Sequence, residues 1–131
     1  MIQAPVTALY AGLSAVLIVV LGMLVVRQRI RTRTPLGTGR APALECAVRA
    51  HANTIEYVPI ALLLMLIAEL NRGAASMLHS YGIALITARI LHAWGISRTP
   101  KPNPGRLIGT ALTWMVITGL AAVDIITFAK T

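Results

Sequence analysis

The sequence predicts an all-α membrane protein, a single domain over residues 1–131 that folds as an up-down bundle of four transmembrane helices. Three observations lead to this prediction. Hydrophobic residues make up 56% of the chain and its mean hydropathy is +0.75, which is too apolar for a water-soluble domain of this size. Residues 1–26 carry no charge, and this run is longer than the roughly 20 residues that cross a bilayer. All four acidic residues lie in or at the ends of apolar stretches.

The positions of these acidic residues indicate where function resides. They are Glu45, Glu56, Glu69 and Asp124. A charged group inside a membrane costs about 3 kcal/mol or more, and it usually faces a protein interior or a watery cavity. The densest polar run, residues 45–57, is therefore the first candidate for a functional site.

The apolar segments predict helices over residues 5–28, 43–71, 74–97 and 104–129. The first segment begins uncharged and runs directly into arginines, whereas a signal peptide begins basic and ends at small residues. We therefore interpret it as a retained helix. The long unbroken apolar runs exclude the alternating strands of a membrane barrel.

Each connection between the helices carries its own turn signal. Residues 30–42 are rich in Gly, Pro and Thr and predict a loop. Residues 71–73 leave room only for a tight hairpin, with Gly73 as a helix stop. Asn103 followed by Pro104 is typical of a helix start, because Asn caps the first turn and Pro suits its first position. Such short connections predict antiparallel neighbours.

The net charge of +8 is distributed unevenly over the connections. Basic residues in or beside the first and third connections are Arg27, Arg29, Arg31, Arg33, Arg40, Arg98, Lys101 and Arg106. The second connection carries only Arg72. The positive-inside rule then predicts that loops 29–42 and 98–103 are cytoplasmic and that both termini lie outside. We expect this multi-pass protein in a bacterial inner membrane.

Other kinds of site have little support in the sequence. The basic loops lack the aromatic side chains on which nucleic-acid bases stack, so we expect no nucleic-acid partner. The single cysteine, Cys46, excludes an internal disulfide. His51, His79 and His92 are scattered without the spacing of metal ligands, so we expect no metal.

A polar stripe runs along the second predicted helix. Glu45, Arg49, Asn53 and Glu56 project within roughly 80° of one another and span about 16 Å, and Tyr57 lies on the flank. A proline at position 59 predicts a bend just beyond the stripe. Two interpretations stay open: an i, i+4 ion pair with polar groups that knit helices or subunits together, or a ligand site. One small bundle hardly supplies partners for the whole stripe, so we expect subunit contacts there.

Two further arginines favour the ligand interpretation. Arg89 lies near the level of Asn53 on the third helix, and His92 follows one turn later. Arg106 lies in the first turn of the fourth helix, where the helix dipole disfavours a cation. Taken alone, Arg106 is better explained as an interface residue that snorkels to water. Together with Arg49, the arginines outnumber the glutamates of the stripe and suit an anionic ligand with several carboxylates.

These residues resemble a known motif. The run 49–59, Arg-Ala-His-Ala-Asn-Thr-Ile-Glu-Tyr-Val-Pro, resembles the second-helix motif of the MAPEG family, the membrane-associated proteins of eicosanoid and glutathione metabolism. The resemblance covers nearly the whole chain. Further matching positions are Glu45, Arg89, Gly105–Arg106 and Pro35–Leu36.

The resemblance implies a homotrimer of four-helix subunits that binds glutathione between neighbouring subunits, in the cytoplasmic half of the membrane. Residues implied to line the glutathione pocket are Glu45, Arg49, Asn53, Glu56, Tyr57, Arg89 and His92. Arg49 would pair with a carboxylate and Glu56 with the γ-glutamyl ammonium. Arg106 matches the arginine that stabilises the thiolate, and Arg27 or Arg29 matches a basic residue that reaches a neighbouring site.

The implied function is a glutathione-dependent transferase or peroxidase that acts in detoxification on lipophilic electrophiles or hydroperoxides from the lipid. A free thiol with a pKa of about 8.5 is mostly protonated at pH 7, and a guanidinium and a helix N-terminus favour its thiolate. The alternative is a non-catalytic trimer that binds lipid or a protein partner. His92 and Ile96 favour it, because they occupy positions where glutathione-binding members often have tyrosines. We interpret Cys46 as a small packing residue.

Overall fold

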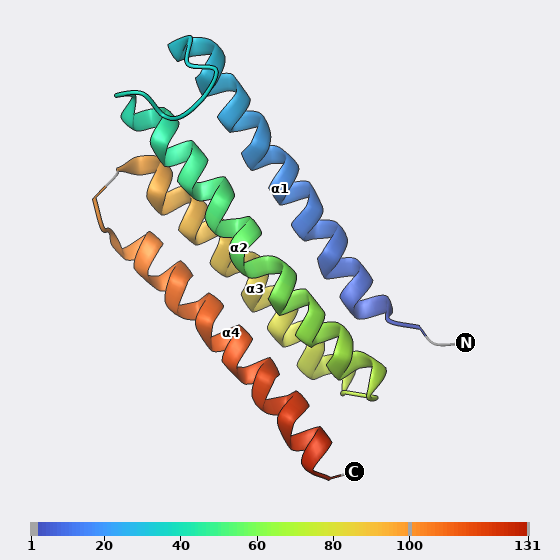
Figure 1. Ribbon diagram of the computed structural model, residues 1–131. Helices are drawn as coiled ribbons and strands as arrows, with labels where there is room; N and C mark the ends of the chain where they lie inside the picture. The colour runs from blue at the N-terminus through green and yellow to red at the C-terminus, as the bar shows by residue number, and fades with distance from the viewer. Residues whose placement is uncertain (1–2, 100, 131) are drawn as a thin grey trace.

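The computed structural model describes residues 3–99 and 101–130, and it forms an antiparallel up-down bundle (Figure 1). The helices are α1 (Pro5–Thr32), α2 (Pro42–Leu70), α3 (Ala75–Arg98) and α4 (Pro104–Ala129). Both longer connections lie at one end of the bundle, which we call the loop end. The α2–α3 turn, the start of α1 and the end of α4 lie at the opposite end. The predicted fold class is thus confirmed.

The predicted end of the first helix was too early. Helix α1 continues to Thr32, where Arg33 takes a left-handed conformation with φ 52° and closes the last turn. The Arg29 side chain then organises the loop, because its Nη1 donates to the backbone oxygens of Thr34, Pro35 and Gly37 at 3.2, 3.2 and 2.9 Å. A charged residue that serves the loop can therefore lie inside the helix. The predicted loop 29–42 began at Arg29, whereas the helix continues for three residues beyond it.

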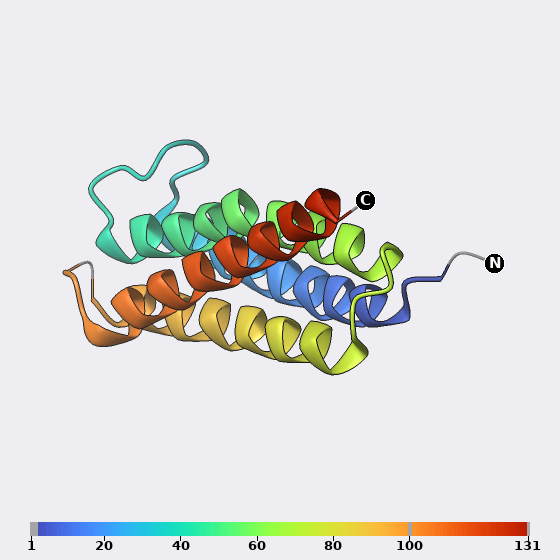
Figure 2. The same cartoon turned by 90° about the horizontal axis from the view of Figure 1, so that it is seen from below.

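The helices pack unequally around the interior. Helices α2 and α3 each contact all three other helices, whereas the described parts of α1 and α4 do not touch each other, as Figures 1 and 2 show. In the described part of the chain, α1, α2 and α4 are long and apolar enough to cross a membrane. Helix α3 is less apolar because it carries charged and polar side chains, and two of these, Arg89 and His92, are buried in the bundle.

Polar contacts hold the end opposite the loops together. The Glu69 carboxylate accepts hydrogen bonds from the backbone amides of Val6 and Thr7 at 2.9 and 2.7 Å. The hydroxyl of Tyr10 lies 2.9 Å from Nδ1 of His79, and the two rings pack edge-on with centroids 5.7 Å apart. The start of α1 is thus attached to the end of α2 and the start of α3.

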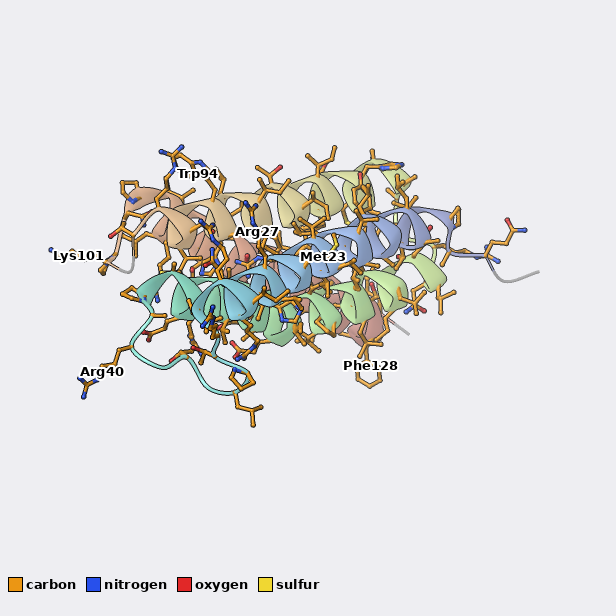
Figure 3. All side chains as sticks on the ribbon, turned by 90° about the horizontal axis from the view of Figure 1, so that it is seen from above. Met23, Arg27, Arg40, Trp94, Lys101 and Phe128 are labelled. Carbon is orange, nitrogen blue, oxygen red and sulfur yellow. The ribbon has the colours of Figure 1, made fainter. Side chains whose placement is uncertain are left out.

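Basic side chains gather at the loop end. Figure 3 shows Arg40 and Lys101 extending from the two connections there, while Phe128 projects sideways from the last turn of α4. This concentration of basic residues at the loop end is the basis for predicting that the loops are cytoplasmic.

Candidate functional site

A pocket of about 260 Å³ opens at the loop end where α2, α3 and α4 meet. We call it the arginine pocket. Its lining residues are Glu45, Cys46, Arg49, Ile96 and Arg106. Two guanidiniums face one carboxylate here, so the pocket carries net positive charge and suits an anionic ligand. Three residues that the sequence assigned to the site are therefore in one place.

The start of α4 delivers Arg106 to this pocket. Asn103 caps the helix, because its Oδ1 accepts a hydrogen bond from the Arg106 backbone amide at 3.1 Å. Arg106 therefore lies in the first turn, where the helix dipole adds positive potential to that of its guanidinium. The predicted cap is confirmed. An anionic group beside Arg106 would gain from both sources of charge.

Arg89 lies elsewhere, in the interior. Its side chain is only 1% exposed, and Nη1 donates to Oδ1 of Asn53 at 2.8 Å while Nη2 donates to the backbone oxygen of Gly109 at 3.3 Å. The Tyr57 ring lies beside it, with the guanidinium carbon 5.9 Å from the ring centroid. Arg89 therefore joins α2, α3 and α4. The predicted convergence of arginines holds for Arg49 and Arg106, whereas Arg89 does not line the arginine pocket.

His92 also lies in the interior, at the contact between α3 and α4. It is 3% exposed, and its Nδ1 is buried without a hydrogen-bond partner among the residues that the structure describes. Gly109 permits this close packing, since a Cβ there would come within 2.8 Å of the His92 Cβ. Ile96, one turn later, does line the arginine pocket and offers it no hydrogen bond.

A second concave surface, of about 380 Å³, lies between α1 and α2. We call it the α1–α2 groove. Its lining residues are Val25, Arg29, Val48, His51, Ala52, Ile55 and Glu56. Arg29 and Glu56, both predicted site residues, meet here. The sequence did not predict that His51 lines a groove, because helical spacing on α2 places it away from the stripe. Only the packing of α1 shows what His51 faces.

The pocket and the groove lie on opposite flanks of one exposed strip of α2. Glu45, Arg49 and Glu56 are exposed along this strip, and within the described chain no hydrogen bond or ion pair satisfies their side chains. Charged groups on a membrane-spanning helix normally face protein or water. The predicted site residues are therefore divided over the pocket, the groove and the interior of a single subunit.

The chain is similar to known proteins over most of its length. The sequence profile of the MAPEG family matches residues 7–125. The inner membrane protein YecN of Escherichia coli strain K12 is 38% identical over 112 residues, which cover 86% of this chain and 84% of that protein. The protein of the same name from Escherichia coli O6:H1 strain CFT073 matches to the same extent.

Proposed function

Because the chain belongs to the MAPEG family, we propose that it is a glutathione-dependent transferase or peroxidase of a bacterial inner membrane. The observation that carries this proposal is the arginine pocket, where Arg49 and Arg106 converge at the mouth of a positively charged cavity. The location follows from the helices that can span a membrane and from the relative named as an inner membrane protein.

The charges of glutathione match the charges of the exposed strip. The peptide has two carboxylates, one ammonium and a thiol. Arg49 holds a carboxylate, Glu56 pairs with the ammonium, and Arg106 with the α4 N-terminus favours the thiolate. The role of Arg106 follows from its position in the first helical turn, where two sources of positive charge coincide.

The division of the site between pocket and groove supports a shared site in a homotrimer. On one subunit, the groove with Arg29 and His51 lies on one flank of α2, and the pocket with Arg106 lies on the other. If subunits pack head to tail around α2, the groove of one meets the pocket of the next. A closed ring of three such subunits would cover the charged strip. The buried strip then faces protein and bound peptide rather than lipid.

The chemistry proceeds from the bound thiolate. With a lipophilic electrophile, the sulfur forms a thioether bond and the leaving group departs with its electron pair. With a lipid hydroperoxide, the thiolate attacks the terminal oxygen, the O–O bond breaks, and the alkoxide takes a proton to become an alcohol. A second glutathione then reduces the resulting sulfenic acid, and a disulfide and water are formed.

Ligand-dependent stabilisation tests the proposal directly. A ligand that binds only the native state stabilises it by about 2.7 kcal/mol at a concentration of 100 times Kd. The unfolding temperature of the detergent-purified protein should therefore rise with glutathione. The Arg49→Met variant should lose most of this rise, whereas Arg72→Met, a matched change at the opposite end, should keep it. If glutathione does not change the unfolding temperature of the wild-type protein, the proposal is refuted.

Two observations favour a second candidate, a non-catalytic trimer that binds lipid or a protein partner. Ile96 gives the arginine pocket an apolar wall, and the side-chain oxygen of Asn53 already accepts a bond from Arg89. Both reduce the hydrogen bonds that remain for a peptide. Turnover distinguishes the two candidates. The enzyme should conjugate a reactive aryl halide or reduce cumene hydroperoxide with glutathione, and the binding protein should do neither.

A further inference from the structure

Asn103 uses both ends of its amide to join two helices. Its Oδ1 accepts from the Arg106 backbone amide at 3.1 Å, as a helix cap does. Its Nδ2 donates to the backbone oxygen of Gly95 at 2.8 Å and to that of Lys101 at 3.3 Å. An ordinary cap needs only the first bond. The second fixes the first turn of α4 to the last turn of α3.

Gly95 makes the same junction possible from the side of α3. A Cβ at this position would collide with the backbone amide of Arg106 and lie 2.7 Å from Oδ1 of Asn103. Gly105 packs similarly, since a Cβ there would lie 3.1 Å from the Trp94 ring. At Gly95 the backbone that carries Arg106 therefore rests directly on the backbone of α3.

This junction lies beside the arginine pocket. Ile96, the residue after Gly95, and Arg106, whose amide Asn103 holds, form the α3 and α4 walls of that pocket. We propose that Asn103 is a positioning residue, which sets the place of the Arg106 guanidinium by tying its backbone to Gly95. The catalytic consequence rests on the proposed function, whereas the positioning itself does not.

Cys46 provides a probe that requires no glutathione. It is the only cysteine of the chain and lines the arginine pocket together with Arg106. The ratio of its alkylation rates with anionic iodoacetate and neutral iodoacetamide reports the local positive potential, since the two reagents attack the same thiol. A general loosening of the bundle would accelerate both reagents and leave the ratio unchanged.

The proposal predicts a specific pattern in this ratio. Arg106→Leu should lower it about fivefold, as expected for loss of one cation at partly solvated short range. Asn103→Ala should lower it about threefold, and the same change in an Arg106→Leu background should lower it no further. The matched control is Asn71→Ala, which removes a side-chain bond to the backbone oxygen of Ile67 at the opposite end of the bundle and should leave the ratio unchanged.

Two further variants separate the bridge from the cap. Asn103→Ser keeps a capping oxygen but removes the amide that reaches Gly95, so it should behave like Asn103→Ala. Gly95→Ala should give the same loss from the other side, because the added Cβ displaces the Arg106 backbone. If Asn103→Ser keeps the wild-type ratio, the bond to Gly95 positions nothing and the proposal is overturned. An unchanged ratio in Gly95→Ala would overturn it equally.

The test also distinguishes this inference from the proposed function. If glutathione binds, Asn103→Ser should lower kcat with little change in KM, because the peptide ends are held by other residues. If glutathione does not bind, the proposed function fails, yet the alkylation ratios still decide whether Asn103 positions Arg106.

Discussion

Arg89 of α3 donates a 2.8 Å hydrogen bond to the side-chain oxygen of Asn53 on α2, deep inside the bundle. A buried guanidinium is costly unless its donors are satisfied. Here neutral oxygens accept from Nη1 and Nη2, the second of them on the Gly109 backbone of α4, whereas Nε is buried without a partner among the described residues. The bond therefore connects three helices through one cation. It also means that two residues assigned to a ligand site serve the interior of the bundle.

The first prediction concerns this bond. Replacement of Asn53 with Ala leaves the Arg89 Nη1 without its closest acceptor, and we expect a loss of about 1–3 kcal/mol in the free energy of unfolding. Unfolding in mixed detergent, followed by circular dichroism, measures it. Ser80→Ala is the control, because that exposed hydroxyl bonds only to its own helix at Ser76. Equal stability of Asn53→Ala and wild type would contradict the structural role.

The second prediction concerns the Glu69 carboxylate, which caps α1 from the end of α2. Replacement with Gln removes the charge that faces two backbone amides at a helix N-terminus, so we expect a loss of about 1–2 kcal/mol. Hydrogen exchange at the amides of Val6 and Thr7 should also accelerate. Glu56→Gln is the matched control, because that exposed carboxylate lies in the middle of α2 and has no described partner. Unchanged exchange at both amides would contradict the cap.

Much of the fold could be predicted because the signals are local. Apolar length and the Asn103–Pro104 start place the helices to within a few residues of the observed bounds. The predicted stop at Gly73 was wrong in detail, because α2 ends at Leu70 and the left-handed residue beyond it is Arg72, with φ 63°. The end of α1 was predicted too early, because Arg29 binds loop carbonyls from inside the helix. A pattern of charges in the sequence does not reveal such bonds. The order of the helices followed from the short connections.

The site was harder to predict because it depends on which faces of the helices meet. Helical spacing correctly placed Arg49 and Glu45 on one strip, and the capped start of α4 brought Arg106 to them. Spacing alone could not show that Asn53 turns to Arg89, nor that α1 makes a groove for His51. Both contacts depend on which helix packs beside α2, and tertiary packing decides this rather than local sequence.

The third prediction concerns orientation. We expect the loop end to be cytoplasmic, because the basic residues of both longer connections lie there. In a Cys46→Ser background, single cysteines at Thr38 and Lys130 should react oppositely with a membrane-impermeant maleimide added to intact cells. Lys130 should label and Thr38 should label only after lysis. The reverse pattern would show that the protein is inserted the other way.

The fourth prediction concerns the shared site. If each site combines a groove from one subunit with a pocket from the next, Arg29→Met and Arg106→Leu subunits should each be nearly inactive alone. When the two variants are co-expressed in equal amounts, about a quarter of the sites should regain activity. Random mixing gives each half of a site about an even chance of being intact, so both halves are intact at about one site in four. Glutathione-dependent turnover measures the recovery, and native mass spectrometry should give the trimer mass.

The control for mixing is a pair of variants on the same half of the site. Arg49→Met and Arg106→Leu both alter the arginine pocket, so co-expression of these subunits should restore nothing. No recovery in the first pair would place the whole site within one subunit. Recovery in the control pair would mean that Arg49 and Arg106 reach each site from different subunits. A monomer in mild detergent would contradict the trimer.

The last prediction concerns Arg106 and the thiolate. Removing its guanidinium should raise the pKa of bound glutathione towards the free value of about 8.5, while Arg49 and Glu56 still hold the ends of the peptide. Each pKa unit corresponds to about 1.4 kcal/mol, so recovery of about two units means roughly 3 kcal/mol of lost thiolate stabilisation. Turnover at neutral pH should therefore fall far more than glutathione affinity.

Thiolate absorbance at the ultraviolet edge, titrated against pH at saturating glutathione, measures this shift in wild type and Arg106→Leu. Arg98→Leu is the control, because that cation lies over the exposed Trp94 ring, 4.8 Å from its centroid, and outside the pocket. Its titration should match wild type. Equal thiolate fractions in wild type and Arg106→Leu would leave Arg106 as a residue of the membrane interface, since a guanidinium that stabilised the thiolate could not be removed without raising that pKa.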